Sequence, residues 1–129
     1  RCFRVADGLY SLWHHTVMTD ISEDMKVACM EIFGPVMSLF KFSDPLDAIR
    51  AVDDSSFGLQ AGLFTNDMEL VNVAFDELEV GGIMVNDIST YRIDHMPYGG
   101  VKSSGFGREG LRYAIEEMTE MKLLTFNRR

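Results

Sequence analysis

The stretch AGLFTNDMELVNVAFDELEVGGIMVN, residues 61–86, decides the fold class because it changes periodicity twice. Its two ends, 61–65 and 82–86, are short apolar runs of strand length. Between them, apolar side chains recur at the spacing of a helix that begins near Asn66 or Asp67 and stops before the paired glycines. A strand, a helix and a second strand in this order predict two parallel strands covered by a helix, and therefore an α/β fold.

The same alternation of strand and helix continues on both sides of this stretch. A helix is expected from Asp44 and Pro45, because the carboxylate can accept from unpaired backbone amides while proline fits the first turn. Another amphipathic helix is expected from about Gly107, and further strands over 37–42 and 122–127. The chain is therefore predicted to form a largely parallel sheet covered by helices.

Composition excludes several classes of function. The chain has 129 residues, the size of one domain or of a piece of a larger one. Its formal net charge of −8 opposes general binding to nucleic acid or to anionic lipid. No apolar run reaches the roughly 18–20 residues that cross a bilayer, and the N-terminus does not resemble a signal peptide. We therefore expect a soluble, cytoplasmic protein with no nucleic-acid or membrane partner.

Neither the cysteines nor the adjacent histidines predict a metal site. Cys2 and Cys29 form no C-x-x-C pair, so they predict neither a disulfide framework nor zinc binding. His14 and His15 would point to opposite faces of an extended strand and would not share one metal ion.

The segment DISTYRIDHMPYGGVKSSGFGRE, residues 87–109, is the long loop after the second strand. Loops longer than roughly 12–15 residues in a compact domain are usually functional or disordered. Disorder is not expected here, because apolar side chains can anchor the loop: Tyr91, Met96, Tyr98 and Phe106. Ligands bind beyond the carboxyl ends of strands in open α/β sheets. We therefore expect an ordered loop that lines a pocket, with His95 as a polar wall and with Ser103 and Ser104 in a turn.

Two residues carry alternatives that the sequence leaves open. Arg92 has a planar guanidinium that matches carboxylates and phosphates, so it either selects an anionic substrate or forms a surface salt bridge with Asp94 or Asp87. Glu31, which begins the stretch EIFGPV, either lies in a plain turn or accepts from two ribose hydroxyls while Phe33 packs against a planar ring.

Five motifs occur in order along the chain: EIFGPV at 31–36, FGLQAGLFT at 57–65, VND at 85–87, MPYGGVKSSGFGREG at 96–110 and MTEMK at 118–122. Together they resemble the C-terminal part of the NAD(P)-dependent aldehyde dehydrogenase superfamily, over residues 16–127. The resemblance implies the second half of that family's catalytic domain over residues 1–121. It implies an oligomerisation strand and tail over residues 122–129.

The resemblance also implies a role at the cofactor for the residues of EIFGPV. Glu31 would hold the ribose next to the nicotinamide of NAD or NADP, and Phe33 would pack beside the nicotinamide ring. The sequence does not discriminate NAD from NADP, because the discriminating residues belong to the dinucleotide domain.

Substrate and subunit contacts follow from the same resemblance. A variable substrate-recognition loop would include Tyr91, Arg92 and Ile93, with Tyr98 as an aromatic wall of the aldehyde pocket. The expected contact between subunits includes Glu120, Leu123, Leu124, Thr125 and Phe126. Homodimers or homotetramers are therefore expected.

The family's reaction needs residues that this chain lacks. The resemblance implies attack of a cysteine thiolate on an aldehyde, hydride transfer to NAD(P), and hydrolysis assisted by a glutamate base. Cys2 and Cys29 lie too close to EIFGPV to be that nucleophile, so no catalytic residue is assigned. We expect a C-terminal fragment that does not oxidise aldehydes alone; the alternative is a non-catalytic assembly or binding module derived from the family.

Three positions depart from the family's pattern. His15 stands where a proline is usual, Met30 where a second acid is frequent, and Asp53 where an asparagine is common. Within the superfamily, YRIDHMPYGGVKSSGFGREG is most similar to enzymes for small or anionic aldehydes. These are the lactaldehyde, phosphonoacetaldehyde and non-phosphorylating glyceraldehyde-3-phosphate types.

Overall fold

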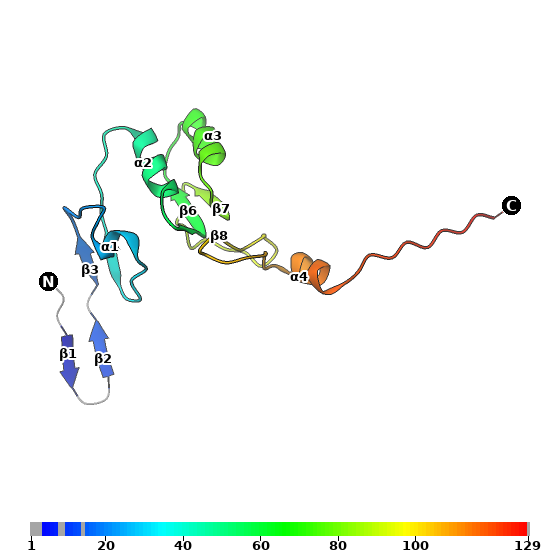
Figure 1. Cartoon of the computed structure of the whole chain (residues 1–129), viewed down its shortest axis with the longest axis horizontal. Helices are drawn as coiled ribbons and strands as arrows, with labels where there is room; N and C mark the ends of the chain where they lie inside the picture. Colours follow the sequence, from blue (N-terminus) through cyan, green and yellow to red (C-terminus); the bar gives the residue numbers. More distant parts are fainter. Residues whose placement is uncertain (1–3, 8–9, 14, 129) are drawn as a thin grey trace. The chain divides into compact units, whose positions relative to one another are not determined.

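The computed structural model of the chain describes residues 4–7, 10–13 and 15–128, and Figure 1 shows its elements in order. Cys2 and His14 therefore lie outside the described residues. The chain divides into two compact units, residues 1–48 and residues 49–129. Among the described residues, no helix has the length and apolarity needed to cross a membrane.

The second unit is built on the strand–helix–strand stretch that the sequence predicts. Strands β6 (Gln60–Leu63) and β7 (Gly82–Val85) are parallel neighbours, joined by helix α3 (Met68–Glu77). Figure 1 shows the two strands side by side in green, with α3 between them along the chain. Asp67 caps α3, because its Oδ1 accepts the N–H of Glu69 at 2.9 Å. The predicted parallel pair with its helix is confirmed.

Helix α2 (Pro45–Asp53) also begins where the sequence predicts. Asp44 Oδ1 accepts the N–H of Leu46 at 2.9 Å, and Pro45 occupies the first position of the helix, where its missing N–H has no cost. Within the described chain, three apolar side chains are buried, one each from α2, α3 and β7: Ile49, Ala74 and Met84. The hydrophobic core of the described residues is therefore small.

The long loop contains a strand that the sequence does not predict. Strand β8 (Val101–Lys102) pairs antiparallel with β5 (Phe57–Gly58). The loop also approaches the sheet very closely, since a Cβ at Gly81 would lie 1.7 Å from the carbonyl oxygen of Gly99. Glycine at position 81 therefore lets the loop lie against the turn that precedes β7.

Helix α4 (Leu111–Met118) begins later than predicted. Gly107 and Gly110 have φ of +75° and +121°, which is incompatible with a right-handed helix, so the helix starts only at Leu111. The final strand expected over 122–127 is not formed in the described chain. Leu123 and Phe126 are 87% and 84% exposed, and a strand needs a neighbouring strand for its backbone hydrogen bonds.

The first unit contains two strand pairs. Strands β1 (Arg4–Asp7) and β2 (Tyr10–Trp13) are antiparallel. Strands β3 (Thr16–Met18) and β4 (Val36–Ser38) are parallel, and the single-turn helix α1 (Lys26–Cys29) lies between them in sequence. The strand expected over 37–42 is shorter than predicted, since β4 ends at Ser38. Beyond that point the N–H of Leu39 still donates to the carbonyl of Met18 in β3 at 2.9 Å.

Replacing Asp67 with Ala should destabilise α3. The variant loses the acceptor for the first backbone N–H groups of the helix, which costs about 1 kcal/mol. Amide hydrogen exchange over Met68–Glu77 should then be about five-fold faster. Asp76→Ala is the matched control, because Asp76 is exposed in the last turn of α3, where a carboxylate does not stabilise a helix. Equal exchange in the two variants would contradict the cap.

Candidate functional site

The long loop begins at a fixed point beyond the carboxyl ends of β6 and β7. Asn86 adopts φ of +57°, in the left-handed region that asparagine tolerates better than most residues. Its Oδ1 accepts the N–H of Thr65 at 2.9 Å, and its own N–H donates to the carbonyl of Leu63 at 2.7 Å. The two strand ends are therefore joined where ligands bind in open α/β sheets.

Arg92, Tyr98 and Glu109 meet within the loop. The guanidinium carbon of Arg92 lies 4.1 Å from the centre of the Tyr98 ring, and its Nη2 lies 2.9 Å from Glu109 Oε2. The backbones of Tyr98 and Glu109 also pair in an antiparallel bridge, with the N–H of Tyr98 donating to the Glu109 carbonyl at 3.0 Å. The salt-bridge alternative predicts Asp94 or Asp87 as the partner of Arg92. The observed partner is Glu109, so this part of the prediction is wrong.

This cluster orients Arg92 more than it stabilises the fold. The side chains of Arg92 and Glu109 are 41% and 68% exposed, so their ion pair contributes no more than about 1 kcal/mol. Stacking on Tyr98 adds a contribution of about 0.5–1 kcal/mol at such an exposed position. Because the contact with Glu109 uses only one of the two terminal nitrogens, the guanidinium still presents further N–H donors to an anionic group.

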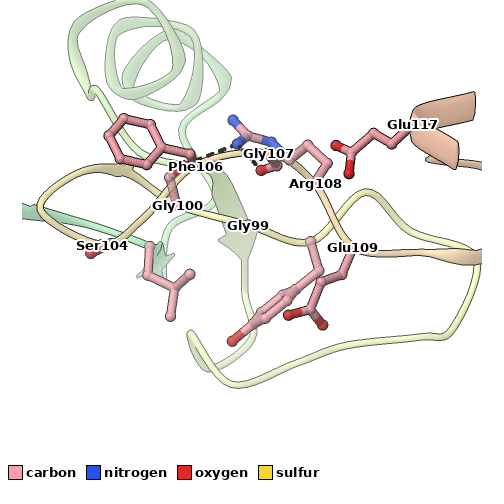
Figure 2. Close-up of a pocket in the computed structure, with 10 residues that line it drawn as sticks. Gly99, Gly100, Ser104, Phe106, Gly107, Arg108, Glu109 and Glu117 are labelled. Atoms are coloured by element: carbon pink, nitrogen blue, oxygen red, sulfur yellow. Dashed lines mark hydrogen bonds between the residues drawn. The ribbon is translucent and has the colours of Figure 1, made fainter. Parts of the chain in front are cut away.

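A pocket of about 340 Å³ lies beside this cluster (Figure 2). Most of its lining comes from the long loop and from α4. The lining residues include Tyr98, Phe106, Arg108, Glu109 and Glu117. Arg108 folds back onto its own loop, where Nη1 donates to the carbonyls of Gly100 at 3.0 Å and Gly107 at 2.8 Å. Figure 2 shows the carboxylate of Glu117 directed from α4 toward Gly107.

The structure corrects two predictions about the loop. Phe106, expected to anchor it, is 102% exposed. His95, expected to form a polar wall, is exposed and does not line the pocket. Tyr91 and Ile93 are also exposed, and each lies at one end of a tight turn. Their contact with a substrate stays a prediction.

The turn predicted for the two serines is confirmed. The N–H of Ser104 donates to the carbonyl of Val101 at 3.1 Å, and Ser104 Oγ accepts the N–H of Gly58 at 3.0 Å.

Sequence reasoning missed Arg108, Glu109 and Glu117 as site residues. The adjacent charges of Arg108 and Glu109 inside a glycine-rich motif were the available signal, since binding and catalytic residues often lie on loops. Glu117 lies on an apparently ordinary helix and offered no comparable signal.

In the first unit, EIFGPV forms a tight turn that leads into β4. The N–H of Gly34 donates to the carbonyl of Ile32 at 2.9 Å, and the N–H of Val36 donates to the carbonyl of Gly34 at 2.8 Å. Phe33 is 92% exposed and Glu31 is also exposed. The turn therefore presents a carboxylate and an aromatic ring two residues apart, so that the carboxylate can accept from a ribose diol while the phenyl ring packs against a planar ring.

Metal-ligating and nucleophilic side chains give no competing site among the described residues. No group of three or more His, Cys, Asp or Glu side chains that could hold a metal ion occurs in the part of the chain that the structure describes. Cys29 is exposed, and its thiol donates to the carbonyl of Met25 at 3.4 Å. The expected subunit-contact residues, from Glu120 to Phe126, are exposed and stay a prediction.

A sequence profile of the Aldehyde dehydrogenase family matches residues 7–124. A curated relative, the 3-sulfolactaldehyde dehydrogenase of Priestia megaterium, is 51% identical over 121 residues. That match covers 94% of this chain and 25% of the relative. The chain therefore spans about a quarter of the length of these curated relatives.

Solved structures give the same result. Aldehyde dehydrogenase 21 from Physcomitrella patens, in complex with its reaction product succinate, has a TM-score of 0.80 and 42% identity over 84% of this chain and 22% of its own. The NAD⁺ complex of an aldehyde dehydrogenase from Bacillus cereus has a TM-score of 0.75 and 36% identity, over 81% of this chain and 21% of its own.

Replacing Asn86 with Gly should release the start of the loop without straining its backbone. Glycine adopts positive φ readily, so the variant loses only the Oδ1 acceptor for Thr65, a hydrogen bond of about 1 kcal/mol. We expect the Thr65 amide to exchange hydrogen about five-fold faster in N86G. Asn86→Asp keeps the acceptor and should exchange at the original rate. Unchanged exchange in N86G would show that this contact does not hold the loop.

Proposed function

This chain belongs to the aldehyde dehydrogenase family, and we propose that the protein carrying it oxidises a small, anionic aldehyde to its carboxylic acid with NAD or NADP. The observation that carries the substrate class is Arg92, which is stacked on Tyr98 and paired with Glu109 in the long loop that follows β7. The nucleophile and the general base are proposed to lie in the protein outside these residues.

The turn in the first unit supports cofactor binding. The exposed Glu31 carboxylate would accept from both hydroxyls of the ribose beside the nicotinamide, and the exposed ring of Phe33 would pack against the nicotinamide. A nicotinamide cofactor supplies the hydride acceptor for the oxidation. A relative of known structure contains NAD⁺, in agreement with this assignment.

The loop in the second unit supports an anionic substrate. The names of two relatives refer to compounds with a negative group remote from the reacting carbon: the sulfonate of 3-sulfolactaldehyde and the second carboxylate of succinate. Arg92 offers a guanidinium suited to either group, because its planar fork matches the geometry of such oxyanions. Tyr91, Ile93 and Tyr98 would complete the contacts with the aldehyde.

The exposed C-terminal segment supports a proposal about assembly. Leu123, Leu124, Thr125 and Phe126 would pair as a strand with another subunit and Glu120 would lie at the same contact, which gives a homodimer or homotetramer. This pairing would supply the neighbouring strand that the segment lacks in the described chain. The proposal keeps the cytoplasmic location expected from the sequence. The alternative function, a non-catalytic assembly module, predicts the same pairing without cofactor binding.

In the whole protein, replacing Glu31 with Gln should weaken cofactor placement. The change removes the negative charge from two hydrogen bonds, each worth on the order of 1.5–3 kcal/mol. We expect the turnover number to fall by at least about ten-fold at saturating aldehyde. Glu23→Gln makes the same change at another exposed acid of the unit and should have no effect. Unchanged cofactor affinity and turnover in E31Q would remove the assignment.

Replacing Arg92 with Leu should raise the KM for an anionic aldehyde selectively. Loss of a hydrogen-bonded charge pair is expected to raise that KM by about ten-fold or more, with little change for acetaldehyde. Arg92→Lys keeps the charge but loses the fork and should fall between the two. Arg112→Leu, which removes an exposed arginine of α4, is the control. Equal changes for anionic and neutral aldehydes in R92L would exclude a recognition role.

A further inference from the structure

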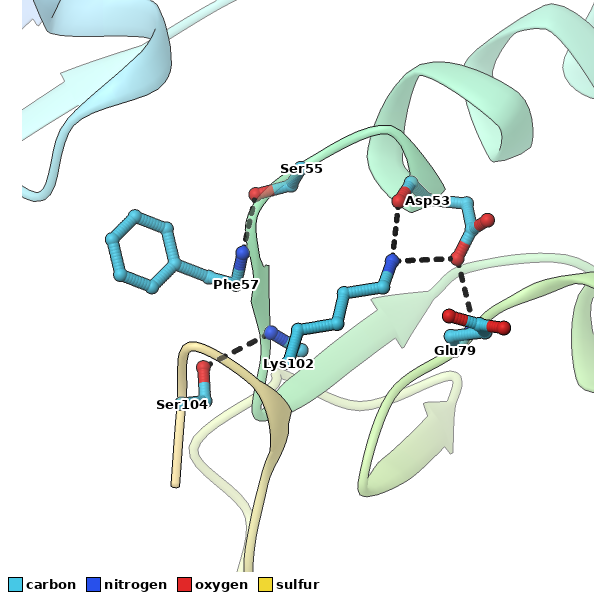
Figure 3. Close-up of polar contacts among 7 residues, drawn as sticks. Asp53, Ser55, Phe57, Glu79, Lys102 and Ser104 are labelled. Carbon is cyan, nitrogen blue, oxygen red and sulfur yellow. Dashed lines mark hydrogen bonds and ion pairs between the residues drawn. The ribbon is translucent and has the colours of Figure 1, made fainter. Parts of the chain in front are cut away.

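An ion pair between Asp53 and Lys102 joins two segments that are far apart in the sequence (Figure 3). Lys102 Nζ lies 3.0 Å from Asp53 Oδ1 and also donates to the backbone carbonyl of Asp53. Asp53 is the last residue of α2, so the ammonium group satisfies a carbonyl at the helix end as well. Lys102 belongs to β8, within the long loop.

The same carboxylate oxygen holds a third segment. Asp53 Oδ1 accepts the N–H of Glu79 at 2.8 Å, in the connection between α3 and β7. This backbone N–H, together with the weaker effect of Lys102, lowers the pKa of Asp53 below its ordinary value. One anionic oxygen therefore joins the end of α2, the connection before β7 and the loop.

The backbone of Lys102 is in a conformation that few residues other than glycine adopt. Its φ is +53°, and its side chain is only 20% exposed. Neighbouring hydrogen bonds keep it there, because the N–H of Ser103 donates to the carbonyl of Ser56 at 3.0 Å. A non-glycine residue in such a conformation, held by several contacts, often marks a position of functional importance.

Residues that line the pocket stand both before and after Lys102 in the loop. Tyr98 precedes Lys102 in the loop and Glu109 follows it, and the backbones of these two residues pair in an antiparallel bridge. Neither Asp53 nor Lys102 lines the pocket. Any effect of the ion pair on the site is therefore indirect, through the backbone that carries the lining residues.

We propose that Lys102 and Asp53 are positioning residues for the aldehyde site, because their ion pair fixes the loop that carries Tyr98 and Arg92. The inference rests on the proposed function, since it gives the loop its substrate. The proposal adds two residues that do not contact the aldehyde but determine where the residues that contact it lie.

The test replaces Lys102 with Met in the whole protein, which keeps most of the aliphatic stem and removes the ammonium group. We expect the KM for an anionic aldehyde to rise by about ten-fold, the scale of one lost charged hydrogen bond, with the KM for the cofactor unchanged. Amide exchange over residues 98–109 should become faster. Lys102→Arg should restore both readouts, because it keeps a cation at this position.

Two further variants make the test specific. Arg112→Met removes the cation of an exposed ion pair in the same unit, where Arg112 Nε lies 2.8 Å from Glu116 Oε1, and should change neither readout. Asp53→Asn keeps the acceptor oxygen without its charge. This variant should raise the KM for the anionic aldehyde and the exchange rate over residues 98–109, each by less than K102M does. It replaces K102M in the test if K102M does not fold.

The outcomes separate the two claims. A whole protein that oxidises no anionic aldehyde overturns the proposed function, whatever the loop does. Unchanged exchange over residues 98–109 in K102M and D53N overturns the role of the ion pair, whatever the activity. A parallel rise in the KM for aldehyde and for cofactor would indicate general destabilisation and would also overturn the positioning role.

Discussion

The parallel pairing of β6 with β7 is the constraint on which the site in the second unit depends. The pairing places the ends of both strands side by side, so that Asn86 can accept from Thr65 and start the long loop at a defined point. Gly81, just before β7, lets the loop return against the strand pair at Gly99. Arg92 is therefore held on a loop that is fixed at its start and again at its middle.

Local chemistry predicted where α2 and α3 begin. Asp67 and Asp44 mark helix starts because a short carboxylate can accept from unpaired backbone amides, and both do so. The pairing of β8 with β5 and of Arg92 with Glu109 could not be predicted in the same way. These partners are distant in sequence, and tertiary packing rather than local propensity brings them together.

The cations of the loop make different kinds of contact. Arg108 and Lys102 each donate to backbone carbonyls, and so they shape the loop. Arg92 instead lies over an aromatic ring with an exposed acid as its partner. An anionic ligand can share its guanidinium at low cost, because an ion pair this exposed is weak. This difference supports the proposal that Arg92 recognises the substrate.

The measurement that tests the central claim most directly is a crystal structure of the whole protein with its nicotinamide cofactor and an anionic aldehyde's product acid. The account predicts that the Glu31 carboxylate accepts from the ribose hydroxyls beside the nicotinamide and that Arg92 donates to the remote anionic group of the acid. A ribose held by other residues, or an acid whose remote anion lies away from Arg92, would contradict it.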